Sequence, residues 1–191
     1  MRSERVRITV EIGLTIALAA VLNTLKLWHM PQGGTVSLGM LPLFILAVRR
    51  GLGVGILAGA LYGVLDYFVD PYVVHWVQAL LDYPVAYAGV GVAGVAAGAW
   101  MKAVRRGTVT TALWTVALPA FLLGAACRYL AHVVSGYVFF SEFAGDQPVL
   151  LYSALYNLYV PISTALCFYA ALVLLPVLSL AEAAPTTSSA R

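Results

Sequence analysis

Long apolar segments separated by short polar connections make up almost the whole chain. Hydrophobic residues account for 62% of its 191 residues, and charged residues for only 10%. Because a helix needs about 20 apolar residues to cross the hydrocarbon core of a bilayer, this length allows about six spans with short connections. The sequence therefore predicts an all-α integral membrane protein, with residues 1–191 in one six-span domain and a short polar tail at about 182–191.

The apolar pattern places the six spans at residues 8–27, 36–48, 51–68, 74–101, 108–140 and 149–180. The second span, of about 13 residues, is short for crossing a bilayer, and we expect it to be tilted or partly re-entrant. The connections at 49–50 and 102–107 are short and basic, whereas those at 29–35, 69–73 and 137–147 are rich in proline, glycine, aromatic and acidic residues.

Basic residues indicate the orientation of these spans. If both termini are cytoplasmic, only Lys26 and Arg128 of the eleven basic residues lie toward the outer side. Because positive charge is enriched in cytoplasmic loops, we predict a multi-pass protein of the cell membrane with both termini in the cytoplasm. Residues with functional potential then gather at the outer end, which favours a binding site near the outer face: His29, Tyr72, His75, Asp82, His132, Phe140, Tyr152 and Asn157.

The fourth predicted span carries a carboxylate inside an apolar segment. His75, Gln78 and Asp82 are spaced i, i+3 and i+7, so a helix would place them on one face. An ionised carboxylate is costly to bury in a bilayer, so Asp82 needs a cationic partner or strong hydrogen bonds. Lys26, Arg128 or a bound cation would each serve, and the pattern does not separate a ligand site from a structural ion pair between Asp82 and Arg128.

The fifth predicted span presents His132, Gly136 and Phe140 at i, i+4 and i+8, again on one face. A glycine beside the histidine leaves room for a flat molecule, and the aromatic ring one turn further could stack on it. The alternative is a helix-packing glycine next to a core histidine, which is common in membrane bundles.

The sixth predicted span begins with Tyr152, Tyr156 and Asn157, whose donors and acceptors suit the edge of a heterocycle. For these tyrosines, and for Tyr72 in the connection at 69–73, the alternative is an aromatic belt at the membrane surface. Together with Asp82, these residues suggest a pocket for a small, flat, cationic molecule.

Other motifs narrow the possible functions. No G-x-x-x-x-G-K-[ST] phosphate loop occurs, so we do not expect the chain itself to hydrolyse ATP. The three histidines, His29, His75 and His132, lie on separate segments, which argues against a metal site or a catalytic set. Cys127 and Cys167 lie in apolar segments without a C-x-x-C partner, so we interpret both as structural.

Small residues mark one face of the first predicted span. Gly13 and Ala17 form a small-x-x-x-small pair, continued approximately by Ala20. Such a pair lets another helix approach closely, and the spacing does not decide whether that helix belongs to a partner or to the same bundle.

Five fragments, in their order and spacing, resemble the thiamine-specific substrate-binding (S) component of energy-coupling factor (ECF) transporters, the ThiT family. The resemblance covers nearly the full length of the chain. The fragments are Met30-Pro31-Gln32-Gly33-Gly34, residues 41–51, residues 78–83, residues 128–140 with Arg128, Tyr129, His132, Ser135, Gly136, Phe139 and Phe140, and residues 152–157.

The resemblance implies a six-helix S-component fold that binds thiamine near the outer surface, under the loop between the first two spans. It implies a coupling subunit in the membrane and two cytoplasmic ATPases as partners, with Gly13 and Ala17 docking on the coupling subunit, and it implies no cofactor. The positions that match the family's ligand contacts are Tyr72, Asp82, Tyr83, His132, Gly136, Phe140, Tyr152 and Asn157.

Two departures from the family pattern stand out. Asp82 replaces the glutamate of at least one family member, so its reach is shorter by a methylene. Phe140 lies where a tryptophan is expected, and no tryptophan follows Gly34 in the first outer loop, where Trp28 or His29 could take its place.

The leading hypothesis is therefore a non-enzymatic, high-affinity thiamine-binding subunit for vitamin uptake. One alternative is an S component for a thiamine precursor, such as the hydroxymethylpyrimidine, or for another vitamin. A second is a proton-driven secondary transporter that uses Asp82 and His132, although no internal repeat is visible. A third, an intramembrane enzyme with the same pair as acid and base, lacks an accompanying nucleophile or metal set.

Overall fold

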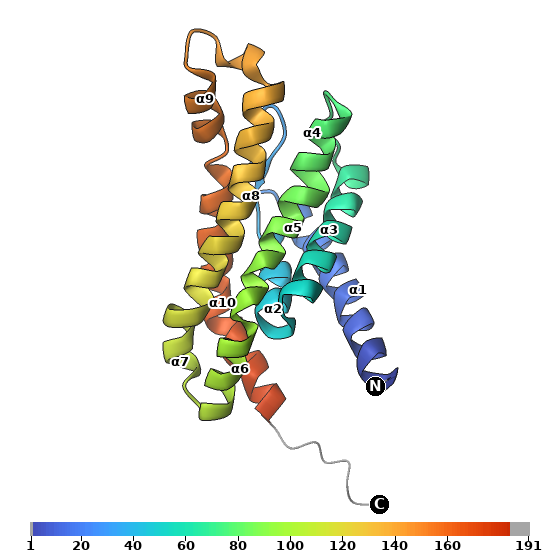
Figure 1. Cartoon of the computed structure of the whole chain (residues 1–191), viewed down its shortest axis with the longest axis vertical. Helices are drawn as coiled ribbons and strands as arrows, with labels where there is room; N and C mark the ends of the chain where they lie inside the picture. Colours follow the sequence, from blue (N-terminus) through green and yellow to red (C-terminus); the bar gives the residue numbers. More distant parts are fainter. Residues whose placement is uncertain (1, 184–191) are drawn as a thin grey trace, which may run out of the picture.

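The computed structural model describes residues 2–183, and these are mainly helical (Figure 1). Six helical segments occur, as the sequence predicts, with ends close to the expected ones. The first three are α1 (Arg2–Thr24), α2 (Met40–Arg50) and α3 (Leu52–Val69). The polar tail expected at 182–191 lies outside the described residues from 184 onward.

The last three segments are long and internally varied. The fourth comprises α4 (Trp76–Leu80), η1 (Leu81–Val85), α5 (Ala86–Val90), η2 (Gly91–Ala96) and α6 (Ala97–Arg106). The fifth comprises α7 (Val109–Ala112), η3 (Leu113–Ala117) and α8 (Leu118–Phe139), followed by the short turn η4 (Ser141–Ala144). The sixth comprises α9 (Val149–Tyr156) and α10 (Tyr159–Ala183).

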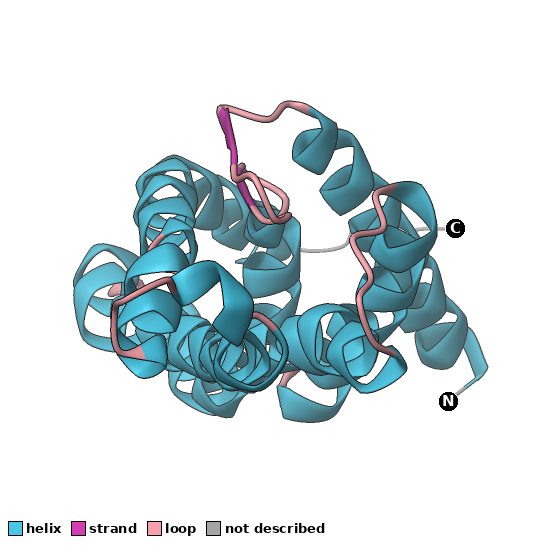
Figure 2. Cartoon of the chain, turned by 90° about the horizontal axis from the view of Figure 1, so that it is seen from above, coloured by secondary structure: helices cyan, strands magenta, loops and turns pink. Residues whose placement is uncertain are grey.

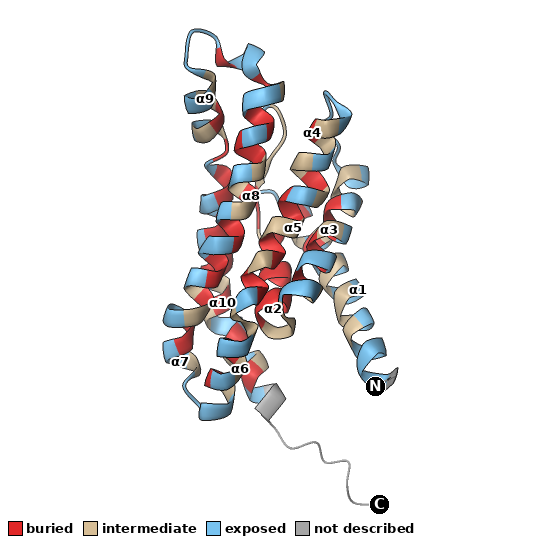
Figure 3. Cartoon of the chain, viewed as in Figure 1, coloured by how far each residue is buried: buried red, intermediate tan, exposed pale blue. Residues whose placement is uncertain are grey.

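Five of the six segments are long and apolar enough to cross a membrane, so the chain is a multi-pass membrane protein. The exception is α2, whose 11 residues span about 16 Å, roughly half of the hydrocarbon core. Residues 40–48 of α2 are all buried, and the helix contacts α1, α3, α6, η2 and α10. The second predicted span is therefore a short central helix that the others surround (Figure 3).

A small hairpin joins α1 to α2, which the sequence did not reveal. Strands β1 (Trp28–His29) and β2 (Thr35–Val36) pair in antiparallel register, with Trp28 opposite Val36. In the end-on view of Figure 2 this hairpin stands between the ends of the helices. Its turn contains Gly33 and Gly34 at φ values of 81° and 88°, and a side chain on Gly34 would also run into the ring of Tyr159.

A stripe of glycines brings α3 against the fourth segment. Gly55, Gly59 and Gly63 recur every four residues, and a Cβ built on any of them would overlap a backbone carbonyl of the fourth segment. Close helix approach through small residues is the usual packing device in membranes, where burial of apolar surface alone gives little attraction between helices. The stripe fixes the fourth segment, and with it Asp82 and Tyr83, against α3.

The two ends of the bundle differ. The start of α1, the turn between α6 and α7 and the end of α10 lie at the lower end in Figure 1, whereas α4 and α9 lie at the upper end. Helix α1 is peripheral: only 17% of its apolar window is buried, compared with 28–44% in the other four membrane-spanning segments. The two described ends of the chain thus lie toward the same end of the bundle, and α1 keeps an open face.

Candidate functional site

A cavity of about 300 Å³ opens between α3, the start of the fourth segment, the end of α8, α9, α10 and the hairpin. All eight positions predicted from the sequence as ligand contacts line it: Tyr72, Asp82, Tyr83, His132, Gly136, Phe140, Tyr152 and Asn157. Further lining residues were not singled out as ligand contacts: Asn23, His29, Gln32, Gly33, Gly34, Thr35, Asp66, Asp70, Pro71, Gln78, Tyr87, Arg128, Ser153, Tyr156 and Tyr159. The structure gathers the predicted set in one place, and contact with a ligand stays a prediction.

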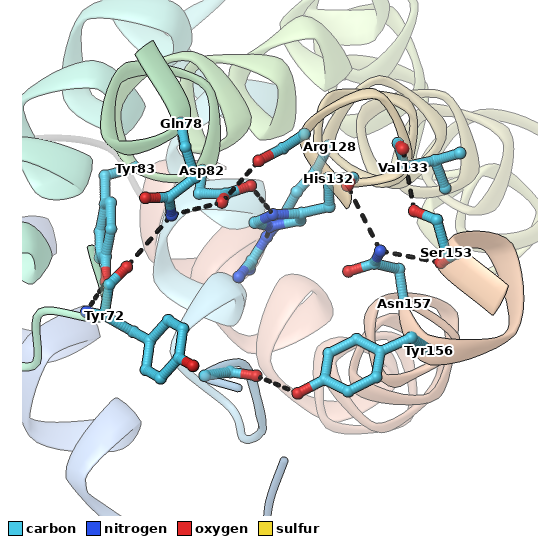
Figure 4. Close-up of polar contacts among 12 residues, drawn as sticks. Tyr72, Gln78, Asp82, Tyr83, Arg128, His132, Val133, Ser153, Tyr156 and Asn157 are labelled. Carbon is cyan, nitrogen blue, oxygen red and sulfur yellow. Dashed lines mark hydrogen bonds and ion pairs between the residues drawn. The ribbon is translucent and has the colours of Figure 1, made fainter. Parts of the chain in front are cut away.

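Asp82 lies within a network of polar side chains in the cavity (Figure 4). Its side chain is 16% exposed, and its Oδ2 accepts hydrogen bonds from Gln78 Nε2 at 2.7 Å and Ser135 Oγ at 2.8 Å. Its Oδ1 lies 2.8 Å from His132 Nδ1. Three polar partners therefore hold the carboxylate, and none of these partners is a lysine or an arginine.

The local backbone explains how Asp82 reaches the cavity. Asp82 and Tyr83 lie in η1, a π-helical turn that contains Pro84. Proline has no N–H to donate, so it interrupts the regular hydrogen-bond ladder, and single π turns of this kind are frequent at functional sites. A straight helix had been expected here, so the π turn changes the register of the predicted face.

The predicted alignment of His75 with Gln78 and Asp82 is correct only for the last two. His75 is exposed, precedes α4 as its N-cap and accepts a hydrogen bond from Val77 N through Nδ1. Its ring stacks on Phe139 at 5.0 Å and does not line the cavity. The helix begins one residue after His75, so helical spacing does not apply to it.

Asp82 and Arg128 do not form the direct ion pair considered from the sequence. His132 links them instead, in a relay of two hydrogen bonds. Arg128 is 7% exposed, lies 4.1 Å above the ring of Tyr87 and donates from Nε to His132 Nε2 at 3.2 Å. His132 thus stands between the arginine and the acid. The other expected partner, Lys26, pairs with Asp70 at the rim.

The face formed by His132, Gly136 and Phe140 lines the cavity as predicted, and Gly136 also has a packing role. A Cβ on Gly136 would overlap Ser153 Oγ, so this glycine lets α8 and α9 approach closely. The ring of Phe140 stacks on Tyr72 with centroids 6.0 Å apart. Two aromatic faces from distant segments therefore meet at one wall.

The end of α9 and the residue after it supply further polar groups to the cavity. Asn157 Nδ2 donates to the carbonyls of His132 and Ser153, and Figure 4 shows its amide oxygen turned toward the middle of the site. Tyr156 O–H accepts from Gln32 N at 2.8 Å and donates to the carbonyl of Gly33 at 3.0 Å, which ties the hairpin turn over the cavity. The hairpin therefore covers part of the site.

Tyr83 lines the cavity with its ring while its hydroxyl is used by the backbone. The hydroxyl accepts from Tyr72 N at 2.7 Å and donates to the carbonyl of Asp70 at 3.1 Å. These bonds fix the connection between α3 and α4. Tyr83 is thus available to a ligand through its aromatic ring.

Asp66 is a second cavity carboxylate that sequence reasoning missed. Its Oδ1 accepts from Asn23 Nδ2 at 2.9 Å and from Tyr62 O–H at 3.3 Å. Asn23 in turn accepts from Ser37, so α1, α3 and the segment before α2 meet here. An ionisable residue inside an apolar span indicates a possible functional site, and the sequence places Asp66 in such a span.

Within residues 2–183 no three His, Cys, Asp or Glu side chains form a metal-binding group. His29 lines the cavity while Trp28 is 66% exposed and does not, so His29 is the better placed of the two proposed substitutes for a loop tryptophan.

Gly13 and Ala17 lie on α1 and do not line the cavity. Both are exposed, and a Cβ added to Gly13 would meet no atom within 4 Å. The structure therefore does not support the alternative in which this pair packs against another helix of the same bundle.

Comparisons with known proteins agree with one another. The profile of the family described as thiamine transporter protein (Thia_YuaJ) matches residues 9–183. The chain is 38% identical to the thiamine transporter ThiT of Bacillus subtilis over 152 residues, covering 78% of this chain and 79% of that one. It is 32% identical to ThiT of Lacticaseibacillus paracasei over 124 residues, covering 62% and 61%. A solved structure of ThiT from Listeria monocytogenes superposes with a TM-score of 0.84 at 25% identity, covering 91% of this chain and 96% of that one.

Proposed function

Because the chain belongs to the thiamine transporter family, the ThiT-type S components, we propose that it binds thiamine with high affinity in the cavity under the hairpin. Thiamine combines a permanently cationic thiazolium, an aminopyrimidine with donors and acceptors, and a hydroxyethyl tail. A pocket for it needs negative charge, aromatic faces and a polar edge.

The observation that carries the proposal is the charge of the cavity wall. Asp66 and Asp82 face a single buried cation, Arg128, while Asp70 is paired with Lys26. With both carboxylates ionised and His132 neutral, one negative charge is left without a counter-charge. A monovalent cation such as thiazolium would neutralise it, and we assign that role to Asp82.

Other lining groups suit the rest of the molecule. The stacked rings of Tyr72 and Phe140 offer π faces to the thiazolium, a contact worth about 2 kcal/mol when desolvated. The amide oxygen of Asn157 and the hydroxyl of Tyr152 suit the polar edge of the aminopyrimidine. The hairpin, tied down by Tyr156, would close over the bound vitamin.

We assign the cavity to the outer face of the cell membrane. The turn between α6 and α7 carries Lys102, Arg105 and Arg106 near one end of the bundle, and the cavity lies toward the other. Enrichment of positive charge in cytoplasmic loops supports cytoplasmic termini and a site open to the outside.

Energy for uptake would come from partners. The relatives carry the name of transporters, and this chain has no phosphate-binding loop motif. We propose a membrane coupling subunit and two cytoplasmic ATPases as partners, with the exposed Gly13 and Ala17 of α1 as the docking face. Small residues there would let a partner helix approach closely.

Replacing Gly13 and Ala17 by leucine should abolish thiamine uptake while leaving thiamine binding by the isolated chain unchanged. A side chain added at Gly13 meets no atom within 4 Å and Ala17 is exposed, so leucines at both positions would obstruct the proposed partner helix rather than this bundle. Uptake of radiolabelled thiamine by cells that co-express the coupling subunit and ATPases measures the first effect, and equilibrium binding measures the second.

Gly98→Leu is the matched control, because Gly98 is exposed on α6 and a Cβ there also meets nothing within 4 Å. It should leave uptake intact. Normal uptake by the Gly13 and Ala17 variants would contradict docking through this face, and loss of binding would return the face to a role in folding.

A further inference from the structure

The protonation state of His132 follows from its two neighbours. Arginine can only donate hydrogen bonds, so Arg128 Nε at 3.2 Å requires His132 Nε2 to carry a lone pair. The single ring proton must then lie on Nδ1, where it points to Asp82 Oδ1 at 2.8 Å. His132 is thus a neutral imidazole with its proton on Nδ1, assigned from the hydrogen-bond network.

We propose that Arg128 is a positioning residue that locks His132 in this neutral tautomer and so reserves the charge of Asp82 for a singly charged cationic ligand. A second proton cannot bind to the imidazole at Nε2 while Nε2 accepts the hydrogen bond from Arg128. Without that bond, His132 could protonate and form an ion pair with Asp82, and the imidazolium would then compete with the ligand's cation.

The charges that face His132 from each packed element support this. Arg128 lies one turn away on α8, Asp82 comes from the fourth segment and Asp66 from α3. From α10 the ring of Tyr159 lies 5.8 Å away, and Asn157, directly after α9, donates a hydrogen bond to the backbone carbonyl of His132. With both carboxylates ionised, a neutral His132 leaves one negative charge on these groups, whereas a protonated His132 would leave none.

The burial of the relay makes the lock effective. The side chain of His132 is 8% exposed and Arg128 is 7% exposed, so water competes little for either hydrogen bond. The bonds that Ser135 and Gln78 donate to Asp82 end on its Oδ2, which leaves Oδ1 to the imidazole. The tautomer itself does not depend on thiamine, whereas its use for a cation rests on the proposed function.

The first test is ¹⁵N NMR of the imidazoles in the purified full chain with ¹⁵N-labelled histidine, without added ligand. Loss of one set of signals in His132→Gln assigns that residue among the three histidines. We expect a protonated Nδ1 and an unprotonated Nε2 from about pH 6 to 8, the range in which an unperturbed imidazole titrates. A proton on Nε2, or an imidazolium within that range, would overturn the proposal.

The second test compares the pH dependence of thiamine binding in the wild type and in Arg128→Met, which has a similar length but no donor or charge. Ionisation of the ligand affects both proteins alike, so the Kd of Arg128→Met divided by the Kd of the wild type reports only ionisation of the protein. We expect this ratio to rise as pH falls through the imidazole range, by up to about tenfold per pH unit for one linked proton. A constant ratio would overturn the role of Arg128.

Gel filtration and thermal unfolding show whether Arg128→Met folds, and the NMR test on the wild type decides the tautomer if it does not. A protonated Nδ1 in a chain that does not bind thiamine would refute the proposed function and leave the tautomer intact. Thiamine binding by a chain in which Nε2 of His132 is protonated would refute the tautomer and leave the proposed function intact.

Discussion

Asp82→Asn is expected to weaken thiamine binding by roughly 30-fold to a few thousand-fold. Removing one partner of a desolvated charge pair costs about 2–5 kcal/mol, and about 1.4 kcal/mol corresponds to a tenfold change in Kd. The carboxylate is 16% exposed, so solvent screens the pair only partly. Thiamine titration into the purified variant measures the loss.

The stability of this variant should change less than its affinity. An asparagine keeps an acceptor for His132, so we expect a cost of about 1–3 kcal/mol from the rearranged bonds to Gln78 and Ser135. Asp82→Glu keeps the charge and should bind thiamine clearly better than Asp82→Asn. Equal losses of folded protein and of binding in Asp82→Asn would contradict its role as the counter-charge.

Asp70→Asn is the matched control for the loss of charge. Asp70 also lines the cavity, but Lys26 already neutralises it and its side chain is 43% exposed. Removing a screened, paired rim charge should change affinity by only a few-fold, because such pairs contribute about 0–1 kcal/mol.

Gly59→Val is expected to prevent folding or to lower the thermal stability of the chain strongly. A Cβ on Gly59 would overlap the carbonyl oxygen of Tyr87, which is backbone and cannot move out of the way as a side chain could. Overpacking in cores costs about 1–3 kcal/mol and occasionally more. Expression and thermal unfolding in detergent measure the effect.

The same helix supplies the control. Gly53 is exposed, and a Cβ there meets no atom within 4 Å. Gly53→Ala should be neutral or stabilise α3 by about 0.5–1 kcal/mol, whereas Gly59→Ala should destabilise the chain. Equal stability of the two alanine variants would contradict the backbone contact between α3 and α5.

The spans could be predicted because apolar length and the positions of charges depend on the solvent more than on tertiary detail. The predicted span at 149–180 coincides with the observed apolar segment Val149–Leu180. Helix α2 was harder: its burial depends on the helices around it, which no local pattern describes. The hairpin could not be predicted, because its strands have two residues each and therefore no strand periodicity.

The candidate site was predicted through the family resemblance and through isolated polar residues in apolar segments. Asp82, His132 and Asn157 stood out for that reason. Partners could not be predicted: the π turn at Pro84 alters the register, so the bond between Asp82 and His132, which lie 50 residues apart, follows only from the packing of two segments. Asp66 was passed over because it lies near the end of its span, where an exposed acid is ordinary.

The four-residue spacing of glycines in α3 is a packing signal that is visible in the sequence. Gly55, Gly59 and Gly63 have the same four-residue spacing as Gly13 and Ala17, and spacing alone cannot say which face packs inside. The structure separates them, since the first set touches backbone of the fourth segment while the second faces outward.

The most direct test of the account is isothermal titration of thiamine into the purified, detergent-solubilised chain. Calorimetry is preferable to intrinsic fluorescence, because none of the four tryptophans, all within residues 2–183, lines the cavity. The account predicts saturable binding of one thiamine per chain at nanomolar concentration, with no comparable binding of the hydroxymethylpyrimidine that lacks the thiazolium. No binding of thiamine, or equal binding of the pyrimidine alone, would contradict a cavity built around the vitamin's positive charge.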